Sequence, residues 1–236
     1  MSERVEGLFL RSTRIKNNAI IVDVLTEKYG RCSFLFPNTS KKKSGFLFQP
    51  FHFIEFSSKF NYEKKINLAS KVELVFSVIN IISDIRKTGY ALLITEVLTK
   101  VIQQQEENKS LYLAIKEIIS QFETQPFNPA FGIFFIKLLI NQFGIQPINN
   151  YSEKTPYFNP KEGKFHEEKD DEVDLLFPNK EFSKLLGTKI DYNSNFKLSS
   201  LNRRRIMDLL LFYMQFHGLI NTEKIKSIQI LQSLYD

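Results

Sequence analysis

Few residues of this chain have types and spacings that could support catalysis or metal binding. Three histidines, His52, His166 and His217, lie far apart, and the one cysteine, Cys32, has no second sulfur near it. A zinc site needs about four ligands, commonly in close pairs, so the sequence predicts no metal site. The run from Lys41 to Gly45 lacks the earlier glycine of a phosphate-binding loop, and no nucleophile motif is present. We therefore expect no catalytic residue and no cofactor, and a protein that is not an enzyme.

Positive charge, in contrast, is concentrated in one part of the chain. Residues 1–80 contain 13 Lys and Arg against 7 Asp and Glu, whereas residues 81–236 contain 19 of each. This asymmetry is typical of a module that binds a polyanion and is joined to a neutral module. The candidate DNA-binding residues are nine of these 13 cations: Arg11, Arg14, Lys16, Lys41, Lys42, Lys43, Lys59, Lys64 and Lys65.

The first 80 residues must position these cations, and their pattern predicts five strands. Five short strands without a long helix favour a small barrel, of which the OB-fold is the commonest five-stranded kind. Lys41, Lys42 and Lys43 are expected on a loop before the fourth strand, where such barrels bind nucleic acid. Arg11, Arg14 and Lys16 flank the connection between the first two strands. The expected strands are Val5 to Leu10, Ala19 to Leu25, Arg31 to Phe36, Leu47 to Phe56 and Lys65 to Phe76.

Aromatic residues are interleaved with these cations. Positive loops can follow phosphates while exposed rings stack on bases. Phe60 and Tyr62, beside Lys59 and Lys64, are the stacking candidates. For the triple lysine, a merely solubilising loop is the alternative. Most rings of the fourth segment are expected in the core: Phe46, Phe48, Phe51, Phe53 and Phe56.

After residue 80 the apolar period changes to that of helices, which predicts a helical domain over residues 81–236. The fold class is therefore α+β, with a barrel domain over residues 1–80. An irregular segment, residues 145–180, interrupts the helices and contains an acidic run that we expect to be a solvated loop. The expected helices are Tyr90 to Val101, Leu111 to Phe122 capped by Ser110, Asn128-Pro129 to Phe143, Ser200 to Gly218, and one from Asn221-Thr222.

Targeting signals are not evident. No apolar run follows a basic start, and the longest apolar run, Phe131 to Ile140, is interrupted by Lys137 and too short to span a bilayer. We therefore expect a cytoplasmic protein with no membrane association.

Several motifs, in the same order along the chain, resemble the RecO family of DNA repair proteins. Glu6 to Arg11 is similar to the opening strand of that family, and Ile21 to Arg31 to its second strand and turn. Lys43-Ser44 followed by Leu47-Phe48-Gln49-Pro50-Phe51 is similar to its basic loop and the strand after it. The closing helices are matched by Arg204-Arg205, Leu209-Leu210, Tyr213, His217-Gly218 and Ile225-Lys226-Ser227.

The resemblance implies a recombination mediator that acts by binding. It implies an OB-fold followed by a helical domain, and binding and annealing of single- and double-stranded DNA. It implies contact with the C-terminal tail of single-stranded-DNA-binding protein, and a complex with RecR that loads RecA. A bacterial, nucleoid-associated, cytoplasmic location is implied as well.

The chain departs from the family in one element. Many members have a four-cysteine zinc element after the glycine and proline that Gly144 and Pro147 match, and this chain has no cysteine there. We therefore reject a zinc ion. Either the element is lost, or aromatic packing holds it through Tyr151, Tyr157, Phe158 and Phe165.

The partner's tail offers apolar side chains and a terminal carboxylate, so its site needs an apolar slot with a cation at the rim. We expect the helix that begins near Asn128 to provide this slot, although these rings are equally well explained as core. The residues predicted for it are Phe131, Phe135, Lys137, Leu138, Arg204 and Arg205.

Two other functional classes remain open. A general adaptor would use the helical domain for protein contacts, while its barrel binds no DNA. A nuclease would need carboxylates such as Asp23, Glu27 or Glu55 grouped near the basic surface.

Overall fold

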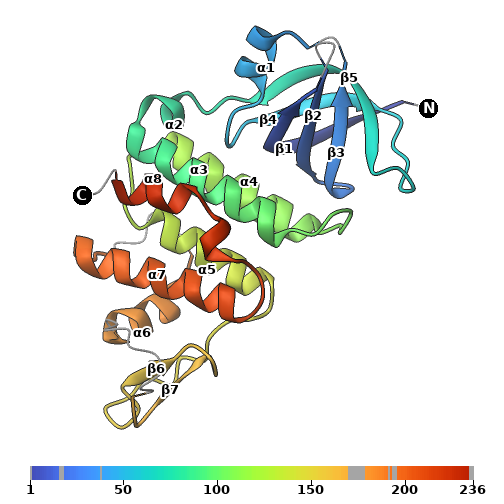
Figure 1. Cartoon of the computed structure of the whole chain (residues 1–236). Coiled ribbons are helices and arrows are strands. Elements are labelled where there is room, and N and C mark those ends of the chain that lie inside the picture. The colour runs from blue at the N-terminus through green and yellow to red at the C-terminus, as the bar shows by residue number, and fades with distance from the viewer. Residues whose placement is uncertain are drawn as a thin grey trace. The chain divides into compact units, whose positions relative to one another are not determined.

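The computed structural model describes residues 2–15, 19–37, 39–169, 179–190, 192 and 196–233 (Figure 1). The chain forms two compact units, one from Met1–Pro126 with Ile225–Asp236 and the other from Phe127–Lys224. The predicted domain boundary between residues 80 and 81 lies inside the first of these units and remains a prediction. In the described ranges, no helix is long and apolar enough to cross a membrane.

The first unit opens with a closed five-stranded barrel in the strand order β1-β2-β3-β5-β4 (Figure 1). β1 pairs with both β2 and β4 and closes the barrel, and β3 pairs with β5 in parallel. The predicted five-stranded OB-fold barrel is confirmed. Its strands are β1 Glu3–Arg14, β2 Ile20–Thr26, β3 Gly30–Phe36, β4 Phe53–Ser58 and β5 Ile66–Phe76.

Aromatic rings fill the barrel. Phe34, Phe36 and Phe56 are almost completely buried, and Phe56 meets the other two rings edge to face at centroid distances of 4.6 and 5.3 Å. Burying one such side chain stabilises the fold by roughly 1.5–3 kcal/mol. The alternation of apolar residues along the strands is therefore explained by an interior filled by large rings.

The segment between β3 and β4 differs from the sequence prediction. The helix α1, Lys41–Leu47, lies where a loop and the start of the fourth strand were expected, and β4 begins only at Phe53. Leu47 and Phe48 pack into the barrel core, with the Phe48 ring 5.4 Å from that of Phe36. The strand prediction was wrong in its first half because these apolar residues close one end of the barrel instead of pairing in the sheet.

The rest of the first unit is helical and comprises α2 Ile79–Ser83, α3 Ile85–Val101, α4 Lys109–Thr124 and α8 Ser227–Ser233. Asn108, not the predicted Ser110, caps α4, because its side chain accepts a 2.9 Å hydrogen bond from the Leu111 amide. The last helix does not begin at Asn221-Thr222 as predicted, since Thr222–Lys224 form a single 3-10 turn. Instead, Glu96 of α3 accepts hydrogen bonds from the Ser227 amide and hydroxyl, and α8 starts there.

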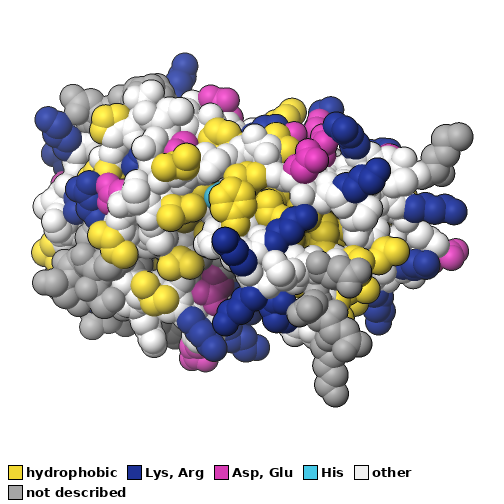
Figure 2. Space-filling model, turned by 90° about the horizontal axis from the view of Figure 1, so that it is seen from above, with side chains coloured by type: hydrophobic (Ala, Val, Ile, Leu, Met, Phe, Trp, Pro, Cys, Tyr) yellow, Lys and Arg dark blue, Asp and Glu magenta, His cyan; other side chains and the backbone are white. Residues whose placement is uncertain are grey.

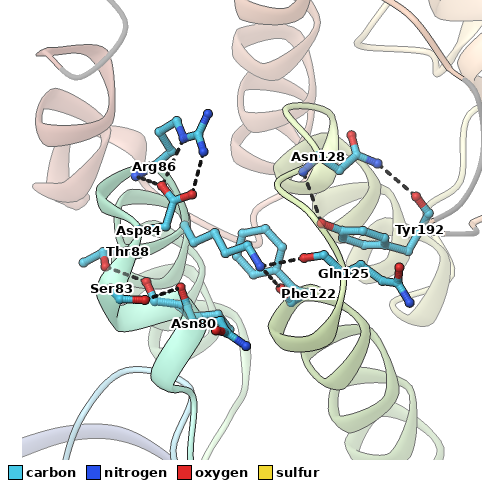
Figure 3. A network of polar contacts seen from close by, with 11 residues as sticks. Asn80, Ser83, Asp84, Arg86, Thr88, Phe122, Gln125, Asn128 and Tyr192 are labelled. Carbon is cyan, nitrogen blue, oxygen red and sulfur yellow. Dashed lines mark hydrogen bonds and ion pairs between the residues drawn. The ribbon is translucent and has the colours of Figure 1, made fainter.

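A buried lysine joins α3 to α4. The Lys87 ammonium donates to the carbonyl oxygens of Phe122 and Gln125, at 2.6 and 2.7 Å, at the C-terminal end of α4 (Figure 3). Nearby, the Glu123 carboxylate accepts hydrogen bonds from the amides of Asn80 and Ile81 at the start of α2. Terminal helix amides and carbonyls lack partners within their own helix, so these two charged groups satisfy them.

A second buried cation joins the barrel to α3. The Arg31 guanidinium in β3 donates to the carbonyl oxygens of Thr99 and Ile102, at 2.5 and 3.1 Å, at the end of α3. It also forms an ion pair with Asp23 at 3.0 Å, and both side chains are almost fully buried. Gly30, just before Arg31, has φ +63°, and a Cβ there would collide with the Glu106 carbonyl group. The β2–β3 turn is therefore fitted closely against the chain that leaves α3.

Asp23 is the acidic centre of this joint. Burial alone would raise the pKa of Asp23, but hydrogen bonds from Ser33, Arg11 and Arg31 hold it below the usual value for an aspartate. The Ser33 hydroxyl and the Arg11 Nε donate at 2.5 and 2.7 Å. The carboxylate is therefore charged at neutral pH, and both of its oxygens accept hydrogen bonds from neighbouring side chains.

The second unit contains α5 Phe131–Gln142, α6 Asn179–Gly187, α7 Ser200–Phe216, and the 3-10 turn. Gly144 and Gly218, at φ +70° and +74°, follow α5 and α7. The helical region is not purely helical, because residues 145–180 include a two-stranded antiparallel sheet, β6 Tyr157–Asn159 and β7 Lys164–His166. Part of the predicted acidic loop, residues 170–174, lies outside the described residues.

Aromatic packing holds this hairpin. Phe158 of β6 and Phe165 of β7 meet across the sheet at 5.1 Å, and Phe158 also meets Phe182 of α6 at 4.7 Å. Tyr151 packs on Phe165 at 5.4 Å, while Tyr157 is 40% exposed. Of the two alternatives for this segment, the structure therefore fits aromatic packing. Tyr151, Phe158 and Phe165 take part in it, and Tyr157 does not.

We predict that Arg31→Ala lowers the free energy of unfolding by about 3 kcal/mol or more, since it removes one of the two cations paired with buried Asp23 and leaves the carbonyl groups of Thr99 and Ile102 without their donor. Arg4→Ala is the matched control, because Arg4 pairs with Glu55 at 3.0 Å on an exposed surface. Its effect should stay below about 1 kcal/mol. Urea denaturation of both variants measures the difference, and equal effects would contradict the assignment.

We predict that prolonged dialysis against a chelator leaves the melting temperature unchanged, because ring packing and not a metal holds the hairpin. Phe165→Ala should instead lower the free energy of unfolding by roughly 3–5 kcal/mol, since it removes a fully buried ring. Calorimetry and elemental analysis of untreated protein provide the measurement. Stoichiometric zinc whose removal lowers the melting temperature would overturn this prediction.

Candidate nucleic-acid interface

The described cations of the barrel divide into those that hold the fold together and those that stand outside its ion pairs. Arg11 and Arg31 pair with Asp23, and Lys28 pairs with Glu3. The remaining candidates gather at opposite ends of the barrel (Figure 1), because β4 begins near α1 and runs to the loop that precedes β5. We name these groups the α1 end, comprising Arg14 and Lys41 to Lys43, and the β4–β5 loop, comprising residues 59–65.

The α1 end presents three lysines on one short helix. Lys41, Lys42 and Lys43 are exposed, and in the part of the chain that the structure describes none of them has an ion pair. The Ser40 side chain accepts a 3.2 Å hydrogen bond from the Lys43 amide and caps the helix. The predicted lysine loop is therefore corrected to a helical turn, which fixes the spacing of the three lysines along the backbone.

Arg14 has a structural partner at this end. Its guanidinium donates to the Thr39 carbonyl oxygen at 3.2 Å and to the Ser44 hydroxyl, which ties β1 to α1. Arg11 is ion-paired, although its side chain remains 59% exposed. Lys16 lies outside the described residues. Among the described cations that flank the first connection, Arg14 therefore holds α1 in place.

The β4–β5 loop contains the second group of free cations. Lys59, Lys64 and Lys65 are exposed, and no carboxylate among the described residues pairs with their side chains. The loop is ordered by Asn67, whose side chain is bonded to the backbone amide and carbonyl of Asn61. Sequence reasoning identified the lysines but missed this asparagine. The sequence Asn61-Tyr62-Glu63-Lys64 signals a turn at Asn61, but it does not point to Asn67.

Each end of the barrel has an exposed ring. Tyr62 is 59% exposed in the β4–β5 loop, whereas Phe60 is stacked on Tyr29 at 3.9 Å and is only partly accessible. Phe46 of α1 is 65% exposed, which differs from its predicted place in the core. Helical geometry explains the difference, since Leu47 and not Phe46 faces the barrel interior.

Figure 2 shows a face of the molecule with Lys and Arg side chains distributed among exposed hydrophobic ones. This combination suits a ligand with a charged backbone and apolar faces. The three carboxylates considered for a nuclease, Asp23, Glu27 and Glu55, are each ion-paired with Lys or Arg. The described residues contain no group of three His, Cys, Asp or Glu that could hold a metal ion. The nuclease alternative therefore has no support in the described part of the chain.

The residues predicted for a partner's tail separate into core and surface. Phe131 and Phe135 are completely buried and Leu138 is nearly so, so these side chains do not line a surface slot. The Lys137 ammonium donates to the carbonyl oxygens of Leu185 and Leu186 at the end of α6, at 2.7 and 3.0 Å. Burial lowers the pKa of Lys137 to about 8.

Lys137 nevertheless borders a pocket of about 450 Å³ in the second unit. Arg204 and Arg205 are not among its lining residues. Lys189, which sequence reasoning missed, is exposed at this pocket and has no ion pair among the described residues. The lining residues are Lys137, Ile140, Asn141, Gln146, Pro147, Leu186, Thr188, Lys189, Ile190 and Leu210.

Comparison with known proteins agrees with this architecture. Residues 1–78 match the family model described as Recombination protein O N terminal, and residues 82–155 match Recombination protein O C terminal. Full-length relatives named DNA repair protein RecO include that of Azobacteroides pseudotrichonymphae genomovar. CFP2, 24% identical over 242 residues with complete coverage of both chains. Those of Bacteroides fragilis and Porphyromonas gingivalis (strain W83) are also 24% identical, with coverage of 100% and 98% of each chain. The chain therefore belongs to the RecO family of non-enzymatic DNA repair and recombination proteins.

Proposed function

We propose that this protein binds single- and double-stranded DNA through both ends of its barrel and anneals complementary strands. With RecR, it loads RecA onto DNA coated by single-stranded-DNA-binding protein, in the cytoplasm at the nucleoid. The observation that supports this most is the set of six lysines at the two ends, Lys41 to Lys43 and Lys59, Lys64 and Lys65. They are exposed and have no ion pair among the described residues.

Lysines without an ion pair bind a polyanion favourably. Each phosphate that a lysine neutralises releases condensed counterions, which drives binding at low salt. Paired cations such as Arg31 cannot contribute without breaking the fold. The adaptor alternative, in which the barrel binds no DNA, predicts no such salt-dependent binding.

The tail of single-stranded-DNA-binding protein is proposed to enter the pocket beside Lys137 and Lys189. Apolar side chains of the pocket, including Leu186 and Leu210, would receive the apolar residues of the tail. Lys189 would pair with the terminal carboxylate, because Lys137 already satisfies the end of α6. This proposal retains Lys137 from the sequence prediction and replaces the buried rings and Arg204 and Arg205.

We predict that changing Lys41, Lys42 and Lys43 together to Ala flattens the salt dependence of single-strand binding. The log–log slope should fall by about 2 units if all three contact phosphate, at about 0.7 per contact. The loss should be similar for every DNA sequence, because phosphate contacts do not read bases. Fluorescence anisotropy at several salt concentrations measures this.

The matched control changes Lys154, Lys180 and Lys184, three exposed lysines of the second unit, to Ala. In both triple variants, each substitution should change the free energy of unfolding by no more than about 0.5 kcal/mol, because the lysines are exposed. A slope in the α1 variant equal to that of the control would show that α1 is only a solubilising surface.

We predict that Lys189→Glu weakens binding of a tail peptide with a free C-terminal carboxylate by roughly tenfold, the typical contribution of a charge-assisted hydrogen bond. A peptide with an amidated C-terminus should bind both proteins equally. Lys184→Glu, in α6 but outside the pocket lining, should bind like wild type. Calorimetric titration gives the affinities. If Lys189→Glu and wild type bind the peptide with the free carboxylate equally well, the pocket is not the binding site of the tail.

A further inference from the structure

The β4–β5 loop is built as a rigid support for one aromatic ring. Asn67 is 2% exposed, and its side-chain oxygen accepts from the Asn61 amide at 2.8 Å while its amide donates to the Asn61 carbonyl at 3.2 Å. The Asn61 side chain accepts in turn from the Glu63 amide at 2.8 Å. Tyr62 lies between these anchored residues. Its position is therefore fixed before any ligand arrives, which lowers the entropic cost of binding.

Aromatic neighbours support the same ring from inside the barrel. Phe60 stacks on Tyr29 at 3.9 Å with an interplanar angle of 12°. Tyr62 meets Phe60 at 4.9 Å and 89°, and Tyr29 at 5.8 Å and 78°. Despite these contacts, Tyr62 remains 59% exposed. A large ring that is held in place yet open to solvent has the form of a stacking platform.

The charges around Tyr62 indicate which ligand fits. Lys59, Lys64 and Lys65 lie within three residues of it and have no ion pair among the described residues, and Glu63 is the one acidic residue of the loop. A ligand that meets free cations and an open ring together must have both negative charge and an accessible flat apolar face. Single-stranded nucleic acid has both, whereas a duplex keeps its bases stacked inside.

The α1 end differs in this respect. Phe46 is also exposed, but within the described residues no other ring packs against it, and the hydrogen bonds with which Arg14 holds α1 do not involve this ring. The α1 end is therefore suited to phosphates, which single strands and duplexes share.

We propose that Tyr62 stacks on a base of single-stranded DNA, so that the β4–β5 loop distinguishes single strands from duplexes. Asn67 acts as the positioning residue for Tyr62. This inference rests on the proposed function, since it requires that the barrel binds DNA. The α1 end then binds the backbone of either form, at the opposite end of the barrel.

The first test compares Tyr62→Ala, Tyr62→Phe and wild type on a short poly-dT strand and on a duplex of equal length. Stacking on one base contributes enough that Tyr62→Ala should weaken single-strand binding by roughly 5- to 100-fold. Duplex binding should change by less than about twofold, the salt slope should stay unchanged, and Tyr62→Phe should bind like wild type, because a phenyl ring also stacks. Tyr157→Ala, at an exposed tyrosine of the second unit, is the matched control.

The second test uses the absence of tryptophan from this chain. In Tyr62→Trp the new side chain is the sole tryptophan, and its emission should be quenched when poly-dT saturates the protein but not when the duplex does. In Tyr157→Trp, neither DNA should alter the emission.

These measurements distinguish a failure of DNA binding from a failure of base stacking by Tyr62. If wild type binds neither DNA, the proposed function fails, and this inference with it. If wild type binds single strands, but Tyr62→Ala binds them equally well and the tryptophan emission of Tyr62→Trp is unchanged at saturation, only the inference is overturned. An equal loss of duplex binding in Tyr62→Ala would also overturn it, because the ring would then not select single strands. A melting temperature for each variant excludes unfolding as the cause.

Discussion

One buried guanidinium links the wall of the barrel to the end of α3. Arg31 pairs with Asp23 in the barrel wall and satisfies two carbonyl groups at the end of α3 that the helix cannot satisfy itself. The chain leaving α3 bonds back to the same region, with the Gln105 amide donating to the Arg31 carbonyl at 2.8 Å. Without this cation, buried Asp23 would keep only Arg11 as a cationic partner, and the end of α3 would lose its donor. The barrel surface that remains for a ligand is therefore determined by where this joint lies.

The described cations of this protein fall into two groups, those bonded within the fold and those free at the surface. This difference says more about ligand binding than the net charge does. Arg31, Lys87 and Lys137 each donate to terminal carbonyls of a helix and are therefore part of the framework. The lysines of α1 and of the β4–β5 loop have no such partner among the described residues. A favourable interaction with phosphate costs the fold little there, since no internal contact must break. The free lysines, more than the overall excess of six positive charges, support DNA binding.

The sequence predicted the barrel and the four longest helices of the described residues, α3, α4, α5 and α7, because strand and helix periods are local properties of the chain. It failed where tertiary packing decides the conformation. Leu47 and Phe48 have a strand-like composition but close the barrel as the end of α1 and the residue after it. Phe131 and Phe135 have the composition of a binding slot but lie in the core, and one apolar stripe cannot distinguish the two. Asn67 and Lys189 were missed because their roles depend on residues brought near only by folding.

Under the proposed function, the two barrel ends, and not the second unit, bind single-stranded DNA. Hydrogen–deuterium exchange of the intact protein, with and without saturating poly-dT, tests this directly because it reports each segment separately. We expect slower exchange in peptides covering residues 39–48 and 59–66, with residues 127–224 unchanged. Slower exchange confined to residues 127–224, with both barrel segments unaltered while DNA is bound, would contradict it.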